Sequence, residues 1–107
     1  MLHVELLVIP ECPHEAEASR LVLSALADVG VRCFSVTTSV IADEREAVQR
    51  GFVGSPTILL NGVDPFAVPS APIVMGCRMY ATPSGLAGTP TLSDVRQALK
   101  RAADRAG

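Results

Sequence analysis

The segment from His3 to Ile9 restricts the fold more than any other, because it is a short and nearly continuous apolar stretch. A strand of this kind is buried on both faces, so other elements must cover the sheet on each side. Pro10 follows and ends the strand, since proline has no backbone N–H to donate to a neighbouring strand. This combination favours an α/β domain.

A helix and a second strand are predicted directly after this first strand. Apolar residues recur between positions 14 and 29 with the spacing of an amphipathic helix. Gly30 is a suitable stop for that helix. Residues 31–38 are rich in β-branched side chains and predict the second strand. Strand, helix and strand in this order predict a parallel pair joined by a helical crossover.

The second half of the chain predicts a shorter helix, two further strands and a last helix. The helix is expected over residues 41–50 and a strand over 57–60, followed by an Asn61-Gly62 turn. Residues 63–75 contain three prolines and predict a long loop, and Val74–Tyr80 is the expected return strand. Thr91 or Ser93 can cap the last helix.

These elements together predict the fold class and the domain count. The order β-α-β-α-β-β-α favours one four-stranded mixed sheet with helices on both faces. A chain of 107 residues is large enough for one core, so we expect a single domain over residues 1–107.

Composition excludes several classes of protein. The chain is 49% hydrophobic and 19% charged, which is typical of a globular protein. A net charge of −2 gives no general attraction for nucleic acid or an anionic membrane, so neither is an expected partner. The first ten residues lack the basic region of a signal peptide, and no apolar stretch approaches the ~18 residues of a membrane span. The odd number of cysteines, three, argues against a secreted disulfide framework, so we expect a cytoplasmic protein with reduced thiols.

The motif Cys12-Pro13-His14-Glu15 lies between the first strand and the first helix. A helix N-terminus presents free N–H groups and the positive end of the helix dipole, and both favour a thiolate. Pro13 suits the first helical position, and a protonated His14 would add positive charge. We therefore expect Cys12 to be a reactive thiol. The alternative is that Cys12 packs as a small apolar residue.

The order of elements and two motifs resemble the thioredoxin-like superfamily, in a single-cysteine variant. The first motif, at residues 12–15, is similar to the family's C-x-x-C motif with Glu15 in place of the second cysteine. The second, Gly54-Ser55-Pro56-Thr57, is similar to the family's segment with a cis-proline. The resemblance implies that Cys12 is the catalytic nucleophile. It implies a supporting site made of Pro13, His14, Glu15, Ser55, Pro56 and Thr57.

The same resemblance implies how a substrate would bind. A peptide or glutathione backbone would pair with the backbone of Ser55 as an added strand. No resident cofactor is implied, and glutathione is the expected co-substrate. A carboxylate at Glu15 cannot resolve a mixed disulfide, so dithiol chemistry within the motif is not expected.

The other two cysteines have different expected roles. Cys33 falls in the second predicted strand and is expected to be a buried structural residue. Cys77 falls in the return strand and is a possible second thiol at the site, with simple burial as the alternative. A soft-metal site formed by Cys12, His14, Glu15 and Cys77 is conceivable by ligand type, but without a C-x-x-C pair we predict no metal.

A narrower similarity extends over residues 54–66 and 77–85. The patterns G-S-P-T-x-L-x-x-G-x-D-P-F and C-R-x-Y resemble small bacterial thioredoxin-like domains associated with organomercurial lyases.

The sequence as a whole leaves three candidate functions. The first is thiol–disulfide exchange through Cys12 with glutathione or a protein partner. The second is soft-metal binding, with mercury as one candidate, by Cys12 and Cys77. The third is a binding module without catalysis, and the oligomeric state stays open.

Overall fold

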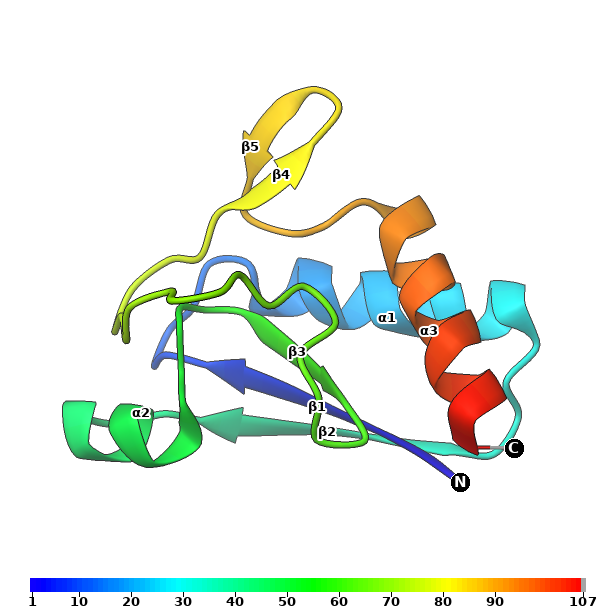
Figure 1. Ribbon diagram of the computed structural model, residues 1–107, viewed down its shortest axis with the longest axis horizontal. Helices are drawn as coiled ribbons and strands as arrows, with labels where there is room; N and C mark the ends of the chain where they lie inside the picture. The colour runs from blue at the N-terminus through cyan, green and yellow to red at the C-terminus, as the bar shows by residue number, and fades with distance from the viewer. Residues whose placement is uncertain (107) are drawn as a thin grey trace.

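The computed structural model describes residues 1–106 and consists of a small sheet, three helices and a separate hairpin (Figure 1). The strands are β1 (Leu2–Val8), β2 (Phe34–Val40), β3 (Thr57–Leu60), β4 (Tyr80–Thr82) and β5 (Gly85–Ala87). The helices are α1 (Glu15–Val29), α2 (Glu44–Arg50) and α3 (Leu92–Ala106).

The sheet is mixed and has β1 at its centre, in the order β2-β1-β3. β1 pairs in parallel with β2, from Leu2 opposite Phe34 to Val8 opposite Val40. It pairs antiparallel with β3, with Val4 opposite Leu60. The predicted parallel pair with a helical crossover is confirmed, and so is the antiparallel third strand. The chain is therefore a mixed α/β protein.

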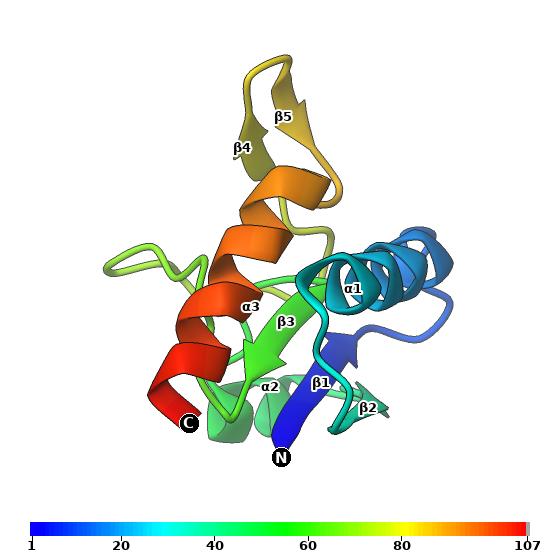
Figure 2. The ribbon, with the colours of Figure 1, turned by 90° about the vertical axis from the view of Figure 1, so that its right-hand side faces the viewer.

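The main core lies between the sheet and the helices α1 and α3. Leu2, Val4 and Leu6 of β1 point to this face, where they meet the apolar faces of the two helices. The helices also pack against each other, and Figure 2 shows them together over the sheet. The buried residues of this core are Leu2, Val4, Leu6, Ala18, Val22, Ala25, Leu26, Ile58, Leu60, Val95, Ala98, Leu99 and Ala102. The periodicity of both helices follows from this one-sided burial.

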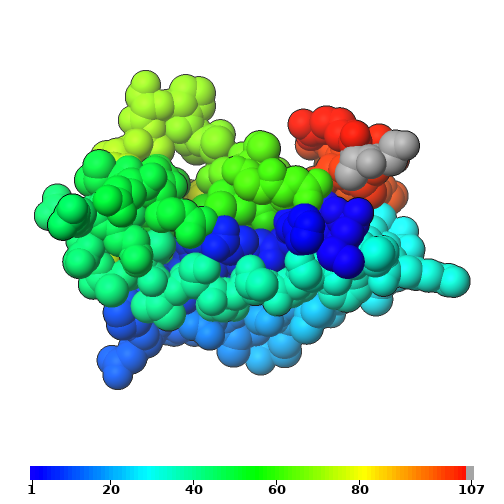
Figure 3. Space-filling model, turned by 90° about the horizontal axis from the view of Figure 1, so that it is seen from below, coloured from blue at the N-terminus to red at the C-terminus, as the bar shows by residue number. Residues whose placement is uncertain are grey.

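The opposite face of the sheet is covered only at one end. Leu7 packs there with Ile41, Ala47 of α2 and Phe52. Further along the strand Glu5 accepts hydrogen bonds from Ser39 at 2.6 Å and Arg50 at 2.6 Å, and these two bonds lower its pKa. Atoms of β1 and β2 are visible at the surface in the view of this face (Figure 3). This face is therefore a small apolar cluster beside a polar surface.

The predicted four-stranded sheet is wrong, because the return strand does not join it. The Asn61-Gly62 turn forms as expected, but the chain pairs with β3 only at Leu60 and Val63. Asp64-Pro65 follows, and Pro65, like the later prolines, cannot donate a hydrogen bond to a neighbouring strand. β4 and β5 instead form a two-stranded hairpin that stands apart from the main sheet (Figure 1).

Gly30 and Thr91 act as the expected helix end and helix cap, whereas the cap at Asp43 was not predicted and starts α2 at Glu44, inside the expected range 41–50. Gly30 ends α1 in the left-handed conformation, with φ 80°. Asp43 caps α2 by accepting a hydrogen bond from the Glu46 N–H, and Thr91 caps α3 by accepting one from the Asp94 N–H. Among the described residues, none of the helices has the length and apolar character needed to cross a membrane.

Candidate functional site

Cys12 lies in the connection between β1 and α1, next to the carboxyl end of the central strand. Pro10 and Glu11 turn the chain, with Glu11 at φ 58°. The Cys12 carbonyl accepts a hydrogen bond from the Glu15 N–H at 3.3 Å, which makes a tight turn ahead of the helix. The Cys12 side chain is nearly enclosed, and 9% of the residue is exposed.

The first helix begins later than expected, which changes the roles of two motif residues. Because α1 starts at Glu15, Pro13 lies before the helix and not at its first position. The residue before a proline disfavours the helical conformation, so Pro13 keeps Cys12 outside the helix. Cys12 therefore sits just ahead of the N-terminal turn.

Ser55 provides the polar contact to the Cys12 thiol. Its Oγ donates a hydrogen bond to Cys12 Sγ at 2.9 Å and accepts one from the Ile9 N–H at 3.0 Å. Ser55 is fully buried, and the peptide bond between Ser55 and Pro56 is cis, the geometry that the resemblance implies. The loop before β3 and the loop after β1 thus meet at a single hydroxyl.

The backbone of Ser55 is already paired within the chain, which contradicts the expected binding of a substrate strand there. The Ser55 N–H donates to the Gly76 carbonyl at 2.8 Å, and the Arg78 N–H donates to the Ser55 carbonyl at 2.9 Å. Ser55 and Cys77 are consequently partners in a parallel bridge. Cys77 is exposed, and all three thiols are free.

His14 and Glu15 do not contact the thiol through any hydrogen bond among the described residues. The His14 ring packs on the backbone of Gly88, where an added Cβ would lie 2.5 Å from Nε2. Its Nδ1 is 4.0 Å from a carboxylate oxygen of Glu17. Glu15 is half-buried at the first position of α1, where a negative charge suits the helix dipole.

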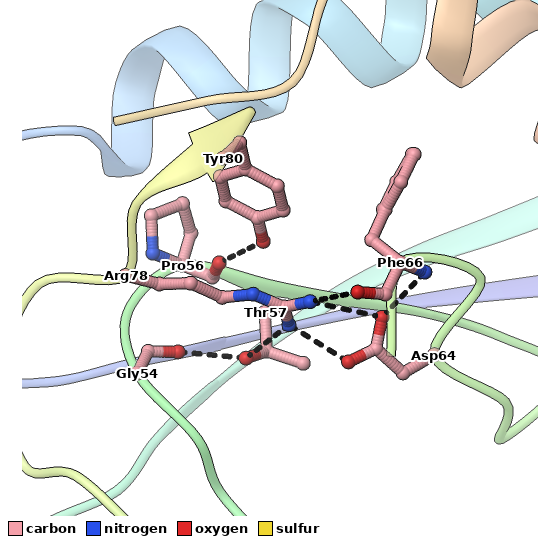
Figure 4. A network of polar contacts seen from close by, with 7 residues as sticks. All are labelled: Gly54, Pro56, Thr57, Asp64, Phe66, Arg78 and Tyr80. Carbon is pink, nitrogen blue, oxygen red and sulfur yellow. Dashed lines mark hydrogen bonds and ion pairs between the residues drawn. The ribbon is translucent and has the colours of Figure 1, made fainter. Parts of the chain in front are cut away.

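A buried network around Arg78 includes Thr57 and Gly54, which lie next to Ser55 and Pro56 in the chain (Figure 4). Arg78 Nη1 is 2.7 Å from Asp64 Oδ2 and 3.2 Å from Thr57 Oγ1, and Nη2 donates to the Phe66 carbonyl at 2.7 Å. Only 8% of the Arg78 side chain and 16% of the Asp64 side chain are exposed. Thr57 also donates to the Gly54 carbonyl at 2.6 Å, so it belongs to this network and not to the Cys12 contact.

Tyr80 attaches the hairpin to the same network. Its ring lies beneath the Arg78 guanidinium, 4.6 Å from the ring centre to Cζ, and meets the Phe66 ring edge to face. The phenol donates a hydrogen bond to the Pro56 carbonyl. Burial raises the pKa of Tyr80 above its ordinary range, against the lowering effect of the Arg78 charge.

Sequence reasoning missed the roles of Asp64, Arg78 and Tyr80, although the motifs D-P-F and C-R-x-Y contain them. The available signal was an arginine between a cysteine and a tyrosine, with an aspartate in a preceding turn. Nothing in the spacing shows that a charged pair is buried. The partners of Arg78 are Phe66 and Asp64, which lie 12 and 14 positions earlier in the chain.

The prediction for Cys33 is wrong. β2 begins at Phe34, one residue later, and Cys33 is exposed beside the strand's start. Within residues 1–106, no group of three or more His, Cys, Asp and Glu side chains is placed to hold a metal ion. Searches of protein-family models, curated proteins and solved structures found no match to this chain.

Proposed function

We propose that the chain is a thioredoxin-like domain and that Cys12 performs thiol–disulfide exchange as a single nucleophile. The observation that carries the proposal is the buried hydrogen bond from Ser55 Oγ to Cys12 Sγ, at 2.9 Å. A hydroxyl that donates to sulfur stabilises the thiolate, which is the attacking form of cysteine.

The arrangement of elements supports the thioredoxin-like part of the proposal. A parallel β1–α1–β2 unit, an antiparallel β3 and a cis-proline loop against the thiol are all present. The fourth strand of the full fold is replaced by the segment that pairs with Ser55. The proposed protein is therefore a shortened variant, and its free thiols suit a reducing compartment such as the cytoplasm.

The exchange needs only the thiolate and a disulfide substrate. Cys12 Sγ attacks one sulfur of the substrate disulfide, a bond forms between them, and the other substrate sulfur leaves as a thiolate that takes a proton from water. The product is a mixed disulfide on Cys12. Glutathione or a protein cysteine is the proposed partner in this step.

Cys12→Ser is the first test, with Cys33→Ser as the matched control because Cys33 is exposed and distant in sequence from the motif. The assay is removal of glutathione from a glutathionylated peptide by reduced glutathione. We expect Cys12→Ser to fall to the uncatalysed rate and Cys33→Ser to keep the rate of the unmodified protein. Equal rates in all three proteins would contradict the proposal and favour a binding module.

Ser55→Ala tests the contact itself. Loss of a hydrogen bond to a charged group costs about 1.5–3 kcal/mol, so the exchange rate at neutral pH should fall by about tenfold or more. The rate of Cys12 alkylation at neutral pH should fall as well in this variant. An unchanged alkylation rate would show that Ser55 does not act on the thiol.

A further inference from the structure

Ser55 is the neighbour of two thiols, one through its side chain and one through its backbone. Its Oγ contacts Cys12 Sγ at 2.9 Å, and its N–H and carbonyl pair with the residues on either side of Cys77. Neighbouring strands lie about 4.8 Å apart, and directly paired residues project their side chains to the same face. The Cys77 side chain is therefore on the face of Ser55 that meets Cys12.

The segment that carries Cys77 is fixed in register by its neighbours. Arg78, the next residue, is held by Asp64, Thr57 and the Phe66 carbonyl. Gly54 allows the close approach, because a Cβ at that position would lie 2.7 Å from Arg78 Cβ. Cys77 is thus anchored on both sides, at Gly76 and Arg78, while its own side chain makes no hydrogen bond among the described residues and is exposed.

The geometry points to Cys77 as the thiol that resolves a mixed disulfide formed on Cys12. This inference rests on the proposed function and supplies the partner that Glu15 cannot be. The Cys77 thiolate attacks Cys12 Sγ, the Cys12–Cys77 bond forms, and the bond from Cys12 to the substrate sulfur breaks. The substrate leaves as a thiolate and takes up the proton that Cys77 released, so the step needs no oxidant.

The internal disulfide then returns to two thiols by reaction with two molecules of an external thiol such as glutathione. A disulfide requires the two Cα atoms to lie within about 7 Å, so the inference requires Cys12 and Cys77, which both neighbour Ser55, to come that close. The chain's own strand beside Ser55 takes the place that a substrate strand would fill. Specificity would then come from the substrate's sulfur and its surroundings at Cys77 and not from backbone pairing.

Oxidised glutathione tests the inference, with peptide mapping by mass spectrometry under non-reducing conditions. In the Cys33→Ser protein we expect a Cys12–Cys77 crosslink, seen as the loss of two hydrogens, and no lasting glutathione adduct. In the Cys33→Ser, Cys77→Ser protein we expect a stable glutathione adduct on Cys12. In the unmodified protein, a glutathione adduct on the exposed Cys33 serves as the control that the reagent is active.

The lifetime of the glutathione adduct on Cys12 measures how much Cys77 accelerates its resolution. A neighbouring thiol acts at an effective concentration of order millimolar, so at about 10 μM external thiol the adduct should last about a hundredfold longer without Cys77. Circular dichroism checks that Cys77→Ser is folded, which we expect because the backbone bonds of Gly76 and Arg78 do not involve the thiol.

The possible outcomes separate this inference from the proposed function. A Cys12 adduct of equal lifetime with and without Cys77, and no crosslink, would overturn the role of Cys77 and leave Cys12 as the nucleophile. Neither an adduct on Cys12 nor a crosslink, while Cys33 reacts, would overturn both. A crosslink with Cys77 and a lasting adduct without it is the result that supports both.

Discussion

Gly54 is a residue at which the loop before β3 closely approaches Arg78. Residues with a Cβ rarely adopt its φ of 128°, and an added Cβ would lie 2.7 Å from Arg78 Cβ and 3.0 Å from Arg78 Cα. The strain and the clash both act in Gly54→Ala. We expect this variant to lose about 2–4 kcal/mol of unfolding free energy in urea denaturation.

Gly62→Ala is the matched control for that substitution. Gly62 also has a positive φ, 82°, but nothing lies within 4 Å of an added Cβ. It should therefore lose only the conformational cost, about 1–2 kcal/mol. If the two variants are equally destabilised, the approach of Arg78 to Gly54 is not what requires glycine there.

The loop from residue 63 to residue 79 forms part of the candidate site, because it carries Cys77 and Arg78 beside Ser55. It has no regular structure of its own, but the ion pair between Asp64 and Arg78 ties its two ends together. Breaking a buried pair leaves one charge without its partner, which is costly. We expect Asp64→Ala to lower the unfolding free energy by about 2–4 kcal/mol, less than a fully buried pair because Asp64 is partly exposed.

Asp28→Ala provides the comparison, since Asp28 pairs with Arg96 at 2.6 Å but both side chains are more than 40% exposed. Exposed pairs contribute about 0–1 kcal/mol. Asp64→Ala should also lower the yield of the Cys12–Cys77 crosslink, whereas Asp28→Ala should leave that yield unchanged. Equal losses of stability in the two variants would show that burial of the Asp64 pair is not decisive.

The elements that the sequence predicts well are those whose burial is periodic. β1, α1 and β3 each bury a face that the apolar pattern marks, and their bounds differ by a residue or two from expectation. The prediction of the return strand was wrong because the prolines after Val63 interrupt pairing with β3, and the segment that follows pairs only at Cys77, with Ser55. Cys33 failed because the start of β2 is set by its register with Leu2, and the sequence does not contain that register.

At the scale of the whole molecule, Tyr80 is one of the side chains that attach the hairpin β4–β5 to the body. Tyr80 is 5% exposed and contacts Arg78, Phe66 and the Pro56 carbonyl. The same contacts connect the hairpin to the loop that holds Ser55. Loss of Tyr80 packing should therefore change the reactivity of the Cys12 thiol as well as the stability of the hairpin.

Tyr80 also predicts how the molecule unfolds in alkali. Burial raises its pKa above the ordinary value near 10, so the folded state keeps the phenol neutral. Stability is complete below pH ~10 and falls above it, by up to about 1.4 kcal/mol per pH unit, because only the unfolded state ionises there. The chain has one tyrosine and no tryptophan, so phenolate absorbance reports Tyr80 alone. In native buffer we expect the phenolate absorbance to rise only as the helical circular dichroism is lost. In concentrated guanidinium, where the chain is already unfolded, we expect it to rise at about pH 10.

Tyr80→Phe is the control for this titration. It removes the phenolate signal and should flatten the decline of stability above pH ~10, at a cost of about 1 kcal/mol for the lost hydrogen bond to the Pro56 carbonyl. Phenolate absorbance that rises near pH 10 while the circular dichroism is still native would mean that Tyr80 is open to solvent. The contacts of Tyr80 with Arg78, Phe66 and Pro56 would then be absent, and the path from Tyr80 through Pro56 to Ser55 would not hold the site together.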